Sequence, residues 1–135
     1  MSGRSAAAGS RQRFSSDGPW EERYGYSRAV RVGDRIVVSG CTAAADADAM
    51  ASSDAAVQAH AALRVGLGAI EGLGGTAADV IRTRMYLTRR EDADAVGAVH
   101  GATLAAAAPA ATMVIVAGLI DPQMVVEIEL EAVVS

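Results

Sequence analysis

The feature that most constrains the fold is the alternating run between positions 124 and 134, near the C-terminus. Its apolar residues are Val126, Ile128, Leu130 and Ala132, and the residues between them are Glu127, Glu129 and Glu131. A period of two in a run rich in β-branched residues predicts a strand with one buried face. The opposite face then carries three carboxylates about 7 Å apart, whose repulsion must be answered by water, arginines or a ligand cavity.

The size and composition of the chain predict a single domain that associates with copies of itself. A chain of 135 residues fits one domain, and it buries only about two-thirds of its unfolded surface. Because 51% of the residues are hydrophobic but only 4% are aromatic, we expect an aliphatic core and spare apolar surface for a second copy. The net charge of −4 argues against nucleic-acid binding, and no apolar run reaches the roughly 18 residues of a membrane span.

The reactive residues are few. The single cysteine, Cys41, excludes an internal disulfide and fits a reducing cytoplasm. No partner base for Cys41 is evident, so a buried thiol is favoured over a nucleophile. The two histidines, His60 and His100, fall on different predicted helices without a carboxylate at ligand spacing, and each is expected to be a packing residue rather than a metal ligand. The absence of lysine removes Schiff-base chemistry, and we expect neither a metal nor a cofactor.

Turn and capping residues divide the chain into alternating strands and helices. Residues 1–14 are predicted to be a flexible tail, followed by a single domain over residues 15–135. Two strands, 26–32 and 35–39, are joined by Gly33-Asp34, a glycine-first hairpin turn. A helix capped by Ser52 or Ser53 ends at Gly74-Gly75, and a strand over 79–87 leads to a second helix over 91–106. Pro109 ends that helix and opens the C-terminal pair of strands.

This order of elements predicts an α+β sandwich, one mixed sheet with both helices on one face. The glutamate face would then lack a helical cover. One interpretation pairs Glu129 and Glu131 with Arg82 and Arg84, which project at matching period from the strand over 79–87. In the other, Glu127, which is nearest the preceding loop, faces a pocket and orients or deprotonates a water molecule as a general base.

Four short motifs, in this order and spacing, resemble the RidA/YjgF family of reactive intermediate (enamine/imine) deaminases. They are Val38-Ser39-Gly40, the run Asp79-Val80-Ile81-Arg82-Thr83, Pro109-Ala110, and Val126-Glu127-Ile128-Glu129. The resemblance covers residues 26–133. It implies a chorismate-mutase-like sandwich that forms a homotrimer around a central barrel, with ligand pockets between subunits.

The same resemblance assigns roles to individual positions. Glu127 takes the place of the family's water-orienting glutamate, and His100 approximately that of an asparagine that lines the pocket. Cys41 stands where the deaminases have glutamine, and Met113 where many have cysteine. The implied substrate-binding residues are Tyr26, Ser39, Gly40, Cys41, His100, Ala111, Thr112 and Met113, with Glu127 as the catalytic residue.

One departure from the family pattern concerns the substrate. Active deaminases have Pro-Ala-Arg-Ser where this chain has Pro109-Ala110-Ala111-Thr112. That arginine grips the substrate carboxylate, and alanine offers no donor in its place. The sequence therefore resembles an arginine-lacking branch, and we expect a metabolite-binding trimer that hydrolyses an enamine, imine or related substrate other than the simple 2-imino acids. Arg23, Arg28 and Arg31 are possible substitutes. The alternatives are a non-catalytic binding protein for a metabolite or a partner protein, and a dedicated pathway deaminase or tailoring enzyme.

Overall fold

The computed structural model describes residues 11–135, and these form one six-stranded sheet. The strands are β1 (Arg11–Phe14), β2 (Ala29–Val32), β3 (Arg35–Cys41), β4 (Val80–Leu87), β5 (Ala110–Ile115) and β6 (Val126–Val133). Their order across the sheet is β1-β2-β3-β6-β4-β5. All neighbours are antiparallel except β4 and β5, so the sheet is mixed, as predicted.

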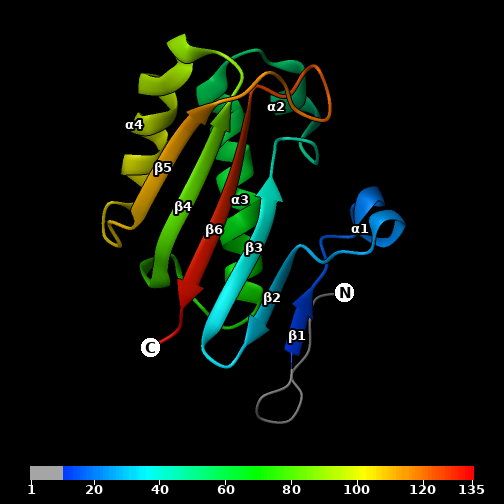
Figure 1. The fold of residues 1–135 in the computed structure, drawn as a ribbon, viewed down its shortest axis with the longest axis vertical. Coiled ribbons are helices and arrows are strands. Elements are labelled where there is room, and N and C mark those ends of the chain that lie inside the picture. Colours follow the sequence, from blue (N-terminus) through cyan, green and yellow to red (C-terminus); the bar gives the residue numbers. More distant parts are fainter. Residues whose placement is uncertain (1–10) are drawn as a thin grey trace.

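The two long helices, α3 (Ala55–Gly72) and α4 (Ala93–Leu104), cover the same face of this sheet (Figure 1). The other helical elements among residues 11–135 are short: α1 (Pro19–Tyr24), α2 (Ala47–Ala51) and the 3-10 turns η1 (Ala77–Asp79) and η2 (Arg90–Asp92) on either side of β4. The core fills the space between α3, α4 and the sheet, and its largest fully buried side chains include Ile36, Leu63, Ile70, Leu87, Ile128 and Leu130. The predicted α+β fold with both helices on one face is therefore confirmed.

The alternation in β6 has the predicted consequence. Val126, Ile128, Leu130 and Ala132 are at most 1% exposed, and the three glutamates project from the other face. The hairpin between β2 and β3 is also as predicted, because Gly33 at its tip has a φ of +62°, which favours glycine. The Gly33-Asp34 turn sets the register in which Val32 pairs with Arg35.

Several details of the structure differ from what the sequence pattern predicts. Residues 11–14, placed in the tail, pair with β2 as strand β1, while residues 1–10 lie outside the described residues. The cap of α3 is Asp54 rather than a serine, because its carboxylate accepts a hydrogen bond from the Ala56 amide at 2.9 Å. A register shift at the start of β4 turns Ile81 outward, to 44% exposure. Finally, β5 pairs with β4 in parallel and not with β6.

No helix among residues 11–135 combines the length and the apolar character needed to cross a lipid bilayer.

Candidate functional site

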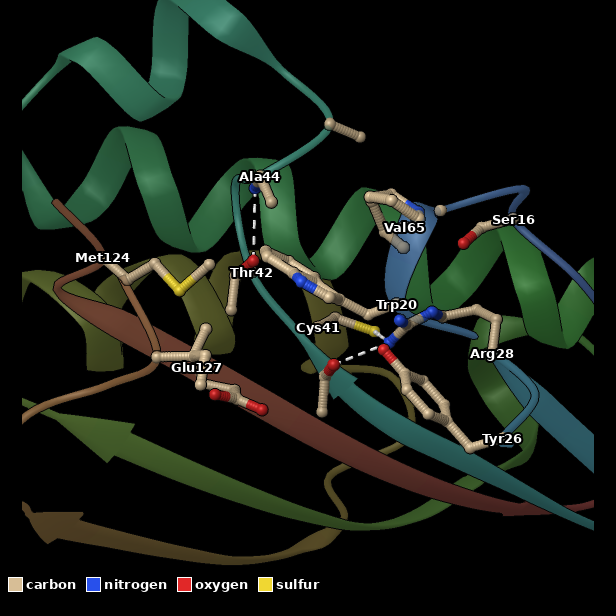
Figure 2. A pocket seen from close by; sticks show the side chains of 15 residues that line it. Ser16, Trp20, Tyr26, Arg28, Cys41, Thr42, Ala44, Val65, Met124 and Glu127 are labelled. Carbon is tan, nitrogen blue, oxygen red and sulfur yellow. Dashed lines mark hydrogen bonds between the residues drawn. The ribbon is translucent and has the colours of Figure 1, made fainter. Parts of the chain in front are cut away.

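A cavity of about 270 Å³ opens where β6 and β3 meet the segment that contains α1 (Figure 2). It is lined from four directions: by α1 and the residues around it, by the end of β3, by Val65 of α3, and by the loop that leads into β6. The lining side chains that the argument uses are Trp20, Tyr26, Arg28, Cys41, Met124 and Glu127. This is a small, concave and mostly apolar site with few polar groups, which is the usual character of a small-molecule pocket.

Glu127 is the acidic group of the cavity, and it lies at the first outward position of β6. Within residues 11–135 its carboxylate makes neither a hydrogen bond nor an ion pair. Burial raises the pKa of Glu127 above its usual range, the neighbouring Glu129 raises it further, and Arg28 opposes both. A half-buried carboxyl group with a raised pKa and no partner can exchange a proton with a ligand or a water molecule.

Gly40 makes room for this carboxylate. A β-carbon at position 40 would lie 1.9 Å from Oε2 of Glu127 and 2.8 Å from its Cδ. Any residue larger than glycine would therefore push the carboxylate out of its position. The Ser39-Gly40 step also coincides with the irregularity in the pairing of β3 with β6, between Val38 and Cys41. The sheet is thus interrupted at the point where Glu127 reaches the cavity.

Arg28 is the basic group of the cavity, and its side chain is largely committed to the protein. Its Nη1 donates a hydrogen bond to the Gly40 carbonyl at 2.6 Å, and its Nε lies 3.7 Å from Oε2 of Glu21. The guanidinium carbon is 5.7 Å from the centre of the Tyr26 ring. Glu21 is itself held by Ser16, whose amide and hydroxyl both donate to its carboxylate. Arg28 thus ties α1 to the end of β3.

Cys41 lies on the inner wall, beside Arg28, at a sulfur–Nη1 distance of 3.7 Å. Burial raises its pKa to about 11, and the nearby guanidinium only partly counters this effect. A thiol that stays protonated at neutral pH is a poor nucleophile. The interpretation of Cys41 as a buried packing thiol is therefore the one that fits the geometry.

The other two glutamates of β6, Glu129 and Glu131, form ion pairs with arginines on neighbouring strands. Nη1 of Arg84 lies 3.5 Å from Oε1 of Glu129 and 3.2 Å from Oε2 of Glu131, and Arg35 also pairs with Glu131 at 2.5 Å. Within the described part of the chain Arg82 forms no ion pair, and its Nε is buried without a partner. The row of carboxylates therefore divides, with Glu129 and Glu131 in ion pairs on the sheet and Glu127 alone in the cavity.

The structure brings only some of the residues named from the sequence to this cavity. Tyr26, Gly40, Cys41 and Glu127 line it, and Ser39 lies beside it, where its hydroxyl donates to the Ser27 carbonyl. His100 does not reach it: its Nε2 is 2.8 Å from the hydroxyl of Thr83, on the face covered by the helices, where burial lowers its pKa. The remaining three lie on β5, with β4 between that strand and β6: Ala111, Thr112 and Met113.

Two functional residues were not singled out as site residues from the sequence: Trp20 and Met124. Trp20 lies on α1, and a signal for this short helix was present. Pro19 stands at its first turn, acidic residues follow, and Gly25 ends it in the left-handed region at φ +77°. Among the three candidate substitute arginines, only Arg28 lines the cavity. Arg31 is bonded to the carbonyls of Gly33 and Leu73 instead.

Within residues 11–135, no three histidine, cysteine, aspartate or glutamate side chains gather closely enough to hold a metal ion.

Known proteins resemble this chain in both sequence and fold. Residues 20–134 match the family model described as endoribonuclease L-PSP. An uncharacterized protein of Streptomyces coelicolor is 37% identical over 121 residues, which cover 90% of each chain. Among solved structures, a member of the YjgF/YER057c/UK114 family from Mycobacterium tuberculosis is 41% identical, with a TM-score of 0.85 over 93% of this chain and 100% of that one. A protein of unknown function from Pseudomonas aeruginosa is 33% identical, with a TM-score of 0.74 over 82% of each chain.

Proposed function

The chain belongs to the endoribonuclease L-PSP family, which includes the YjgF proteins, and on this premise we propose that its cavity binds a small metabolite and hydrolyses a C=N bond in it. The observation that carries the proposal is Glu127, a half-buried carboxylate inside the cavity with a raised pKa and with no partner in the described part of the chain. A carboxylate that only stabilised the fold would be paired, as Glu131 is.

The proposed reaction needs one group that both accepts and returns a proton. Glu127 takes a proton from a water molecule as the water oxygen bonds to the carbon of the protonated imine, and the C=N π electrons move to nitrogen, giving a neutral carbinolamine. The same carboxyl group then returns that proton to nitrogen. The C–N bond breaks as the hydroxyl oxygen forms the C=O bond and gives its proton back to the carboxylate, and a carbonyl compound and ammonia or an amine leave. The raised pKa suits both steps, because it makes the carboxylate a stronger base toward water and keeps the proton on the carboxyl group until nitrogen takes it.

The proposed substrate is not a simple 2-imino acid. In the resembling deaminases an arginine at position 111 would hold the substrate carboxylate. Here Ala111 stands at that position, exposed on β5, and it offers no donor. Losing a two-pronged contact that positions the substrate should cost several kcal/mol of transition-state binding.

We further propose that the working unit is a homotrimer whose pockets lie between subunits. Support comes from the sheet face opposite α3 and α4, which no element among residues 11–135 covers (Figure 1). This face combines the ion pairs of Arg84 with exposed apolar residues such as Val37, at 46% exposure. A neighbouring subunit would be needed to bring Ala111, Thr112 and Met113 near a pocket. Light scattering should then give three times the chain mass of 13.7 kDa.

The test of the function is imine hydrolysis by wild-type protein and by Glu127→Gln, which keeps the shape of the side chain and removes its charge. Imines would be generated in the assay from a panel of amines, with 2-iminopropionate included. We expect acceleration for imines without a carboxylate, a loss of about 10²–10⁴-fold in Glu127→Gln, and little activity on 2-iminopropionate. Glu129→Gln, on the same strand and face but outside the cavity, is the matched control.

Two results would overturn parts of this proposal. Saturable ligand binding without turnover of any imine would favour a non-catalytic binding protein. Rapid hydrolysis of 2-iminopropionate would refute the restriction on substrates. We do not extend the endoribonuclease description of the family model to this cavity, because no histidine lines it, the chain has no lysine, and its net charge is −4.

A further inference from the structure

We propose that the cavity selects a small organic cation, a protonated amine or iminium with an apolar body and no carboxylate. This inference rests on the proposed function and names the charge class of its ligand. It follows from how the charged side chains of the cavity are distributed, from the contacts that hold Arg28, the one arginine that residues 11–135 contribute to the cavity, and from the nature of its walls.

After the charge of Arg28 is paired with that of Glu21, the remaining charge in the cavity is negative. Arg28 is matched by Glu21, whose Oε2 lies 3.7 Å from its Nε. Glu127 has no such partner among residues 11–135, and Glu129, two residues along the same face, adds to the negative potential around it. The thiol of Cys41 stays neutral because its pKa is about 11. An anionic ligand would meet Glu127 without a free cation to offset it, whereas a cationic ligand would supply the missing counter-charge.

The Nε edge of Arg28 is not free to grip a ligand carboxylate. Its Nη1 is bonded to the Gly40 carbonyl, and that contact holds the end of β3. Its Nε, which would form one prong of a two-pronged bond along that edge, is buried, has no hydrogen-bond partner within residues 11–135 and faces Glu21. A carboxylate could use that edge only by displacing Glu21, which Ser16 holds through both its amide and its hydroxyl. The arginine therefore has a structural role in this cavity.

The walls of the cavity suit an organic cation with an apolar body. Two aromatic side chains, Tyr26 and Trp20, line the cavity. The ring of Tyr26 already has the guanidinium of Arg28 over it. The other, Trp20, makes no such contact with any of residues 11–135 and lies among the lining side chains shown in Figure 2. An indole face is the best of the aromatic surfaces for an ammonium or iminium group. Val65, Ile120 and Met124 supply apolar surface for the rest of the ligand.

This preference agrees with the chemistry proposed above. Protonation of a C=N nitrogen makes its carbon more electrophilic, and an ionised carboxylate beside it favours the protonated form. A cavity that selects the iminium ion therefore also selects the reactive form of the substrate.

The chain provides its own probe, because Trp20 is the only tryptophan. Butylammonium and butanoate, similar in size and opposite in charge, would be titrated at constant ionic strength while the emission of Trp20 is followed. We expect a saturable change with butylammonium at an affinity at least about tenfold higher than with butanoate. Glu127→Gln should abolish that preference, and Glu129→Gln should keep most of it.

The outcomes separate this inference from the proposed function. Tighter binding of butanoate, or an unchanged preference in Glu127→Gln, would overturn the cation claim while leaving the cavity as a ligand site. A titration in which neither ion changes the emission of Trp20 would also overturn it. The hydrolysis assay is independent of these titrations: imine turnover that depends on Glu127 would uphold the proposed function even if the charge preference failed.

Discussion

Replacing Gly40 by alanine should remove function at a small cost in stability. The added β-carbon would lie 1.9 Å from Oε2 of Glu127, 2.8 Å from its Cδ and 3.1 Å from its Cγ. These contacts are all with one side chain that makes no hydrogen bond to residues 11–135, so we expect the carboxylate to swing away while the backbone stays in place. The φ of Gly40 lies outside the left-handed region, and alanine adds no backbone strain there.

The magnitudes follow from this geometry. Overpacking a well-filled site costs about 1–3 kcal/mol, and we expect the lower end because the neighbour can move. A loss of about 1 kcal/mol lowers the Tm of a domain of this size by about 4 °C. A displacement of the carboxylate by 1 Å or more should reduce kcat/KM for imine hydrolysis by about 10²-fold.

The assay pairs thermal unfolding, followed by circular dichroism, with imine hydrolysis. Gly68→Ala is the control, because a β-carbon at position 68 of α3 would meet nothing within 4 Å. That variant should keep full activity and gain about 0.5–1 kcal/mol of stability. Wild-type kcat/KM in Gly40→Ala would refute the argument that glycine is needed to admit Glu127 to the cavity.

Two further groups give predictions from their pKa shifts. Cys41, whose pKa is raised to about 11, should react with iodoacetamide at pH 7.5 at least about 100-fold more slowly in the native protein than in urea, and equal rates would contradict its burial. Burial lowers the pKa of His100 from 6.5, so the unfolded chain binds its proton more readily and its contribution to stability is lost as the pH falls below about 6.5. Denaturant unfolding between pH 7 and pH 5 should show a steeper loss in wild type than in His100→Asn, and identical slopes would contradict this assignment.

The parts of the fold that could be predicted are those fixed by local pattern. The period of two in β6 identified its buried face, and the Gly33-Asp34 turn identified the hairpin, because both signals depend only on neighbours in sequence. The strand β1 was missed because Arg11–Phe14 has no apolar alternation and is held by pairing with β2. The outward turn of Ile81 depends on a register shift against β6, which no local pattern reveals.

The site was only partly predictable for a related reason. The place of Glu127 in a pocket could be predicted from the period of the strand and from its position beside the loop. The family resemblance added Tyr26 and Gly40 to the predicted site. The role of Arg28 depends on contacts with Gly40 and Glu21, which lie on different elements. The position of Ala111 depends on strand order, because β4 separates β5 from β6. Such arrangements are set by the packing of the whole domain and leave no periodic signal.

The most direct test of the account is the thermal stability of Glu127→Gln as a function of pH. Because the folded state raises the pKa of Glu127 above its usual value near 4.5, the ionised carboxylate destabilises the fold at neutral pH, and this effect disappears as the pH falls below that value. We predict that the variant melts above wild type at pH 7 and level with it at pH 4, while it loses imine hydrolysis. A variant that melts below wild type at pH 7 would show that Glu127 stabilises the fold, and would contradict the claim that this carboxylate is held in the cavity for function.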